Sequence, residues 1–221
     1  MASSTSTLLD VANVVYRALG ERSVLTLSNT QGDRVKDCIR QACIDVETLH
    51  TWDWLQKKVV ANDWVTNLAK LDVYQRIHGV QIGDTTKGYR ELTYVPEMTL
   101  DKMPVTSYNG TSDEAQYYTL VEGGVRFNRY PNDAVSRNRI VFYVQEPIMY
   151  PTADNNVFFN VPQRYVTLIE KKSCYLMCIR YLDDAQAASY FQQELEQLVQ
   201  QYRNYERKAP TKRLSIYKGS K

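Results

Sequence analysis

Long apolar runs, glycine and proline are all scarce in this chain of 221 residues. It contains 9 glycines and 7 prolines, too few for a collagen-like or low-complexity chain. No apolar stretch reaches the roughly 18 residues of a membrane span, and the opening MASSTSTLLD lacks the basic and apolar regions of a secretory signal. We therefore expect neither membrane insertion nor secretion. With 43% hydrophobic residues, the chain can bury a core of its own.

Cysteine and histidine are also few, and their spacing does not favour a metal site. Cys38 and Cys43 fall in one expected helix, and Cys174 and Cys178 fall in another. Two cysteines of one helix do not easily reach disulfide geometry, and these spacings differ from the C-x2-C of zinc knuckles. We expect buried, unpaired thiols. A zinc site built from both pairs is the weaker alternative.

The familiar motifs of catalysis are missing. The chain has no phosphate-binding loop, no dinucleotide-binding glycine pattern, no nucleophile elbow and no HExxH helix. His50 and His78 are 28 positions apart, in different expected elements. Asp183 and Asp184 are adjacent, and adjacent residues on a helix diverge by about 100°, which favours a helix cap over a catalytic carboxylate pair. We expect no enzymatic activity and no cofactor.

Charge is spread unevenly along the chain. The formal net charge is +2, but the segment from Tyr202 to Lys221 holds seven cations and one anion, so it carries +6 and the preceding residues carry −4. Such a basic tail is typical of a segment that meets nucleic acid or an acidic protein surface, with simple solvation as the alternative. The chain also has 17 tyrosines, a residue type enriched at protein interfaces.

Helical periodicity is present at both ends of the chain. Apolar residues recur at helical spacing in Ser4–Leu19 and again in Asn29–Leu49. Pro162 marks the start of a further helical segment, in which Asp183-Asp184 either breaks or recaps the helix. A helix unbroken from Gln163 to Lys208 would be about 70 Å long at 1.5 Å per residue, too long for one copy of this chain to cover.

Between these two helical parts of the chain, the helical spacing of apolar residues gives way to patterns typical of short β-strands. Short strands are expected at Lys58–Val65, Arg76–Ile82, Tyr89–Tyr94 and Arg139–Gln145. A hairpin is expected over Tyr118–Asn128, with its turn at Gly123-Gly124. Four arginines cluster around the hairpin and the loop after it, and they are candidates for contact with phosphate, with a solvated rim as the alternative: Arg126, Arg129, Arg137 and Arg139.

Together these elements predict an α+β fold. We expect a helical bundle formed by the N- and C-terminal helices (residues 1–56 and 161–208), an inserted antiparallel β domain (57–160) and an extended basic C-terminal arm (209–221).

The order of the motifs resembles that of head-to-tail adaptor proteins of tailed bacteriophages, the tail tubular protein A-like connectors. The first part of the resemblance is carried by VVYRALGE at Val14–Glu21, VLTL at Val24–Leu27 and TWDW at Thr51–Trp54. The second part is carried by the Gly123-Gly124 hairpin, Phe127–Pro131, Ile140–Val144, Val161-Pro162 and the helix pair divided near Asp183. The resemblance covers nearly the whole chain and depends on the order of motifs that are individually common.

The resemblance implies a non-enzymatic structural protein of the virion, assembled in the bacterial host cytoplasm. Such adaptors form a ring of twelve copies beneath the portal protein, extend the channel used in genome ejection and carry the tail nozzle or another tail component. Genomic DNA would pass the ring without sequence-specific contact, and no membrane is involved. The four arginines named above would then face the lumen or the tail. The portal-binding arm is assigned to Tyr202, Arg203, Tyr205, Arg207, Lys208, Lys212, Arg213, Leu214, Ile216, Tyr217 and Lys218.

Two other functions stay open at the level of sequence. A free nucleic-acid-binding protein would use the basic tail and the tyrosines. A tail-completion or neck protein of a longer-tailed phage would share the fold and differ only in its neighbours. The larger β insertion, compared with the simplest short-tailed relatives, leaves the tail type undetermined.

Overall fold

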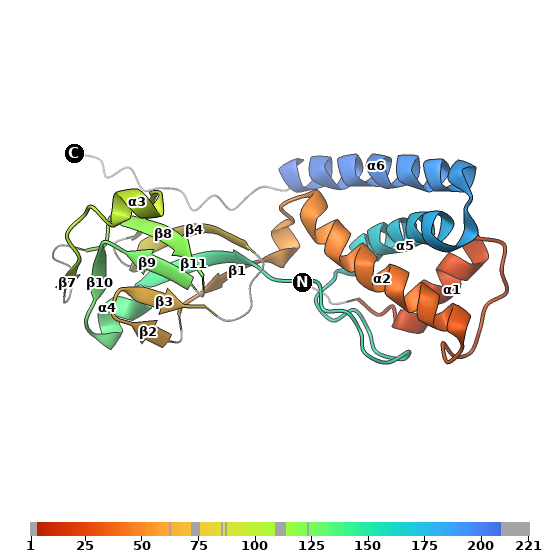
Figure 1. The fold of residues 1–221 in the computed structure, drawn as a ribbon, viewed down its shortest axis with the longest axis horizontal. Helices are drawn as coiled ribbons and strands as arrows, with labels where there is room; N and C mark the ends of the chain where they lie inside the picture. The colour runs from red at the N-terminus through yellow and green to blue at the C-terminus, as the bar shows by residue number, and fades with distance from the viewer. Residues whose placement is uncertain are drawn as a thin grey trace. The chain divides into compact units, whose positions relative to one another are not determined.

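The computed structural model describes residues 4–61, 63–71, 76–84, 86, 88–108, 114–122 and 124–208 (Figure 1). These residues divide into two compact units. The helical unit contains residues 4–55 and 147–208, and the β unit contains residues 56–146. Helices from both ends of the chain and strands from its middle confirm the expected α+β class.

The two N-terminal helices begin where side chains cap them. α1 (Leu8–Ala18) follows Thr7, whose side chain forms a reciprocal capping box with Asp10. α2 (Thr30–Leu49) follows Asn29, whose side chain accepts a hydrogen bond from the Gly32 amide. A Cβ on Gly32 would lie 2.7 Å from the backbone of Leu27, so glycine here allows the preceding loop to lie against α2.

The helical unit packs around α5 (Gln163–Met177), which contacts α1, α2 and α6 (Ala185–Lys208). The short helix η1 (Asp53–Leu55) adds Trp54 to the same core. The four cysteines are free and buried in this core, which confirms the expected packed thiols. The core includes these large, fully buried side chains: Leu8, Tyr16, Leu27, Ile39, Trp52, Leu55, Phe158 and Tyr165.

The C-terminal helical segment is divided at Asp183-Asp184, which was one of the expected alternatives, so no helix runs unbroken from Gln163 to Lys208. α5 continues into a π-helical turn, η2 (Cys178–Leu182), and the helix ends at Asp183, which adopts a left-handed conformation with φ of 51°. Asp184 then caps α6, because its side chain accepts a hydrogen bond of 2.9 Å from the Ala187 amide. Aspartate favours caps and tolerates the left-handed region better than most residues, which is why this pair turns the chain.

After this turn, α6 packs back along α5 (Figure 1). Its apolar face is buried inside the same chain, through Ala188, Phe191, Leu195 and Val199. The ion pair between Lys171 of α5 and Glu194 of α6, at 2.7 Å, joins the two helices at their edge. The apolar face of this helix therefore has its partner within one copy and needs no second copy to cover it.

Residues 147–160 belong to the helical unit, although we expected the insertion to extend to residue 160. Ile148 and Phe158 are buried in the helical core. The side chain of Asp154 accepts a hydrogen bond of 2.8 Å from the Leu27 amide and pairs with Lys36 at 3.2 Å. These contacts fix an irregular segment to the helices, so the β unit ends at residue 146.

The β unit is built from short strands. In its described residues, one sheet has the order β1-β11-β4-β5, a second has the order β2-β3-β9-β8-β6, and β7 pairs with β10. The strands are β1 (Gln56–Val59), β2 (Asp63–Val65), β3 (Leu68–Lys70), β4 (Arg76–Asp84), β5 (Gly88–Glu91), β6 (Thr93–Tyr94), β7 (Thr106–Tyr108), β8 (Tyr117–Val121), β9 (Gly124–Phe127), β10 (Arg129–Pro131) and β11 (Ile140–Gln145). Most pairs are antiparallel, as expected, but β6–β8 and β7–β10 are parallel.

The expected hairpin is present as β8 and β9, which pair antiparallel with Leu120 opposite Val125. Gly124 begins β9 at a close approach to β3, where a Cβ would lie 2.1 Å from the Ala69 carbonyl oxygen. Only glycine fits there without moving one of the two strands. Gly123, the other glycine of the expected turn, lies outside the described residues.

The two larger sheets share one apolar core. Phe127 of β9 and Phe142 of β11 meet edge to face with ring centroids 6.2 Å apart. Trp64 of β2 stacks on Phe127 at 5.5 Å. Two short helices, α3 (Glu97–Leu100) and α4 (Ala134–Asn138), complete the unit. The second lies in a segment expected to be only a polar loop, and it starts because Asp133 caps it.

Among the described residues, none of the helices has both the length and the apolar character that crossing a membrane requires.

The packing of α6 within its own chain can be tested with Leu195→Ala. Leu195 is 2% exposed, so its truncation is expected to lower the free energy of unfolding by about 2–5 kcal/mol. Gln193→Ala, two residues away on the exposed side of α6, is the control and should change it by less than about 0.5 kcal/mol. Urea unfolding of the monomer gives both values. Equal, small effects would mean that α6 is not packed in a single copy.

Candidate functional site

The cysteines of the helical core are unsuited to chemistry. No group of three or more metal-ligating side chains gathers among the residues that the structure describes. Burial raises the pKa of Cys38 to about 11 and that of Cys174 to about 12. Both thiols are therefore protonated near neutral pH, which makes them poor nucleophiles and poor metal ligands.

The first three residues of the expected portal-binding arm lie in α6, where they contact the helical unit. The Tyr202 hydroxyl donates a hydrogen bond of 2.5 Å to the Arg164 carbonyl at the start of α5. The Arg203 guanidinium donates one of 2.6 Å to the Leu49 carbonyl at the end of α2. The Tyr205 ring lies under the Arg164 guanidinium, 4.5 Å from it. These contacts join the end of α6 to two other helices.

A buried carboxylate lies at the same place. Glu206 is 8% exposed and accepts a hydrogen bond of 2.9 Å from the Tyr165 hydroxyl, while His50 Nε2 lies 3.3 Å from its other oxygen. Burial raises the pKa of Glu206, and the nearby Asp53 acts in the same direction. Burial and the hydrogen bond to Glu206 raise the pKa of Tyr165. The last turn of α6 is thus held by a polar cluster inside the unit, defined here as the α6 anchor: His50, Arg164, Tyr165, Tyr202, Arg203 and Glu206.

The remaining residues of the expected arm continue from this anchor. Arg207 and Lys208 complete α6. Six further residues lie outside the described residues: Lys212, Arg213, Leu214, Ile216, Tyr217 and Lys218. Residues 209–221 therefore follow directly after a helix end that is fixed in the helical unit.

Two of the four arginines near the hairpin are engaged by carboxylates of the β unit. Arg126 of β9 pairs with Glu97 at 3.4 Å and with Asp101, both at the short helix α3. Arg139 pairs with Glu114, and both side chains are largely buried, at 14% and 13% exposure. A charge that is buried against its counter-ion is not available to a phosphate without breaking that pair. This arrangement argues against phosphate contact by Arg139, whereas the carboxylates paired with Arg126 are more than half exposed.

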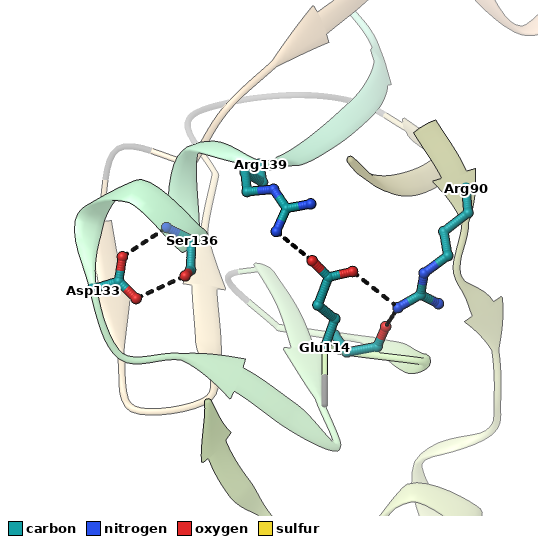
Figure 2. Close-up of polar contacts among 6 residues, drawn as sticks. Arg90, Glu114, Asp133, Ser136 and Arg139 are labelled. Atoms are coloured by element: carbon teal, nitrogen blue, oxygen red, sulfur yellow. Dashed lines mark hydrogen bonds and ion pairs between the residues drawn. The ribbon is translucent and has the colours of Figure 1, made fainter. Parts of the chain in front are cut away.

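Glu114 connects two arginines, as Figure 2 shows. Besides Arg139, it pairs with Arg90 of β5 at 3.5 Å, and Arg90 also donates a hydrogen bond of 2.9 Å to the Ala115 carbonyl. In the same view, Asp133 accepts hydrogen bonds from the Ser136 amide at 2.9 Å and the Ser136 hydroxyl at 2.7 Å. The first cluster joins segments distant in the chain, and the second shapes the turn that leads into β11.

The other two arginines lie on neighbouring elements of the same region. Arg129 begins β10, opposite Thr106 of β7. Arg137 belongs to α4, where its side chain donates a hydrogen bond of 3.4 Å to the Pro131 carbonyl and its guanidinium lies 6.0 Å from the Trp64 ring. The structure therefore places all four arginines in the β unit: Arg126 is on β9, Arg129 on β10, Arg137 on α4, and Arg139 lies between α4 and β11.

An apolar surface that the sequence analysis did not identify lies on the segment 149–159. Met149 is 51% exposed and Phe159 is 69% exposed, and both line a shallow hollow of about 420 Å³. The apolar residues of this segment follow neither helical nor strand spacing. In the sequence, only their number could have indicated an exposed apolar surface. Exposed apolar side chains that lie together are typical of a contact surface.

The role of the α6 anchor can be tested with Tyr165→Phe. This change removes a hydroxyl that donates to the buried Glu206, so the free energy of unfolding should fall by about 1–3 kcal/mol. Tyr190→Phe is a matched control, because Tyr190 also donates to a glutamate, Glu194 at 2.8 Å, but is 56% exposed. Denaturant unfolding measures both. Equal losses in the two variants would contradict a special role for the buried pair.

Comparison with known families covers both units. The model of the SU10 adaptor protein family matches residues 6–214. A search of curated proteins finds no match. The family match extends over nearly the whole chain and confirms the resemblance to phage head-to-tail adaptors. The chain belongs to the SU10 adaptor protein family and is a phage structural adaptor.

Proposed function

We propose that the chain assembles as a ring of twelve copies beneath the portal protein of a tailed phage. The ring extends the channel through which DNA leaves the head, and its far side receives the tail nozzle or another tail component. The observation that carries this proposal is the family match over residues 6–214, which includes the helical unit, the β unit and the start of the basic tail. The copies act in the virion, after assembly in the host cytoplasm, and perform no catalysis.

The α6 anchor supports a role of the tail in portal binding. Arg203 and Tyr202 fasten the last turns of α6 to α2 and α5, so the tail starts from a fixed position. The thirteen residues 209–221 would span about 45 Å if fully extended. A segment tethered at a fixed point meets a nearby partner at high effective concentration.

The composition of the tail favours an acidic protein surface with apolar pockets as its target. In the segment Lys212–Lys218, cations at both ends flank Leu214, Ile216 and Tyr217. The cations steer association with an opposite charge, and the apolar side chains bind in pockets that a phosphate backbone does not offer. We therefore assign this segment to the portal protein. DNA that passes through the ring meets it without sequence-specific contact.

A free nucleic-acid-binding protein is the second candidate, because the segment Tyr202–Lys221 carries +6 whereas the rest of the chain carries −4. The two candidates differ in what the tail requires. Nucleic-acid binding depends on the number of cations and weakens steeply with salt. Portal binding depends in addition on the apolar residues between them.

Two tail variants separate these functions. Deletion of residues 209–221 should leave the thermal unfolding of the protein unchanged and abolish co-sedimentation with portal particles of the same phage. Leu214→Ser/Ile216→Ser/Tyr217→Ser keeps every charge, so it should bind DNA like the unaltered chain and lose at least about tenfold in portal affinity.

Retained portal binding by the deletion variant would rule out the tail as the portal contact. Binding of the serine variant to portal with unaltered affinity would favour a purely electrostatic tail. Failure of the unaltered chain to co-sediment with portal, together with salt-sensitive DNA binding, would support the nucleic-acid alternative.

A further inference from the structure

The exposed face of α6 is almost free of charge. Eleven of its side chains up to residue 206 are exposed, and only Glu196 among them is ionisable near neutral pH. At 100° per residue, most of the others fall on one line along the side of the helix opposite the buried face. We define this line as the amide stripe: Gln186, Tyr190, Gln193, Gln197, Gln200 and Asn204.

The charged side chains that flank the amide stripe form hydrogen bonds or ion pairs within the helical unit. Glu194 accepts from Lys171 at 2.7 Å and from the Tyr190 hydroxyl at 2.8 Å. Glu196 accepts a hydrogen bond of 2.7 Å from Gln192. Arg203 is bound to the Leu49 carbonyl on the other helix. The stripe is therefore a neutral, hydrogen-bonding surface whose charged neighbours have partners within the same unit.

The exposed face of α2 has the composition that solvent normally favours. Four of its eight exposed residues are charged, namely Asp33, Arg34, Asp37 and Arg40. Depletion of Lys, Glu and Asp is a property of the centres of protein interfaces, since a charge is costly to remove from water. Two long helices of one unit thus differ in their outer faces, and the difference points to contact at α6.

We propose that the amide stripe is the surface by which α6 contacts a second copy of this chain. This inference rests on the proposed ring, in which each copy meets a neighbour. In a ring the stripe meets a different surface of the next copy, and a neutral stripe carries no charge that this facing surface would have to match. Each amide group both donates and accepts hydrogen bonds, so it pairs with polar groups of another surface without needing a charged partner.

The size of the stripe indicates when this contact forms. A helix of 24 residues is about 36 Å long and about 10 Å wide, so one face offers on the order of 400 Å² per copy. The contact then buries about 800 Å² in total, below the roughly 1,200 Å² of a stable complex. Because the apolar face of α6 is already covered by α5, nothing in α6 adds to this area. The copies therefore stay apart in solution and join when a portal holds them side by side.

The test places charges on the stripe without disturbing the helix. Gln193→Lys/Gln200→Lys adds two cations at exposed positions, and the second of them follows Glu196 at the favourable spacing of four residues. The matched control, Gln31→Lys/Thr48→Lys, adds the same charge to the exposed face of α2. All three proteins should be monomers by light scattering and unfold at similar temperatures. On portal particles, the stripe variant should assemble at least about tenfold less adaptor than the control.

A photo-crosslinking side chain at position 197 identifies the neighbour. On assembled portal particles, the expected adduct joins two copies of this chain. An adduct with portal or tail protein, or full assembly of the stripe variant, would overturn the inference while leaving the proposed function intact. A stable oligomer of the unaltered chain in the absence of portal would contradict it as well. Failure of the unaltered chain to bind portal counts against the proposed function itself.

Discussion

The return of α6 onto α5 is the packing on which the rest of the helical unit depends. It is set by two aspartates, Asp183 in a left-handed conformation and Asp184 as a helix cap. Their turn buries Phe191 and Leu195 within one copy, so the apolar face is used for folding. What remains outside is a neutral face along α6 and an anchored end from which the basic tail continues. We therefore expect a subunit that folds alone and that, as proposed, uses polar surfaces for assembly.

Local signals in the sequence predicted much of the fold. Capping and apolar periodicity located α1, α2 and α5, and alternation around a glycine pair located the β8–β9 hairpin. Long-range pairing had no such signal. The parallel pairing of β7 with β10 joins three-residue strands, and the packing of residues 147–160 on the helices depends on single side chains such as Phe158. Helical periodicity also continued across Asp183, so it could not show that the chain reverses there.

The candidate site was only partly predictable for the same reason. Tyr202, Arg203 and Tyr205 were assigned to the arm through the family resemblance and the charge of the segment, but their contacts with the helical unit depend on residues far away in the chain. Glutamate is rarely buried, so nothing in the sequence marked Glu206 as an internal residue. The arginines of the β unit were visible as a cluster, yet Glu97, Asp101 and Glu114 lie too far from them in sequence for the ion pairs to be inferred.

A cryo-electron microscopy map of the assembled phage particle tests this account as a whole. We expect a ring of this chain between portal and tail, with the hairpin of α5 and α6 intact in every copy, the exposed face of α6 against the next copy, and the C-terminal segment on the portal. Absence of the chain from the junction would contradict its role as a ring-forming adaptor. A ring in which α6 has left α5 would contradict the claim that each copy folds by itself before it assembles.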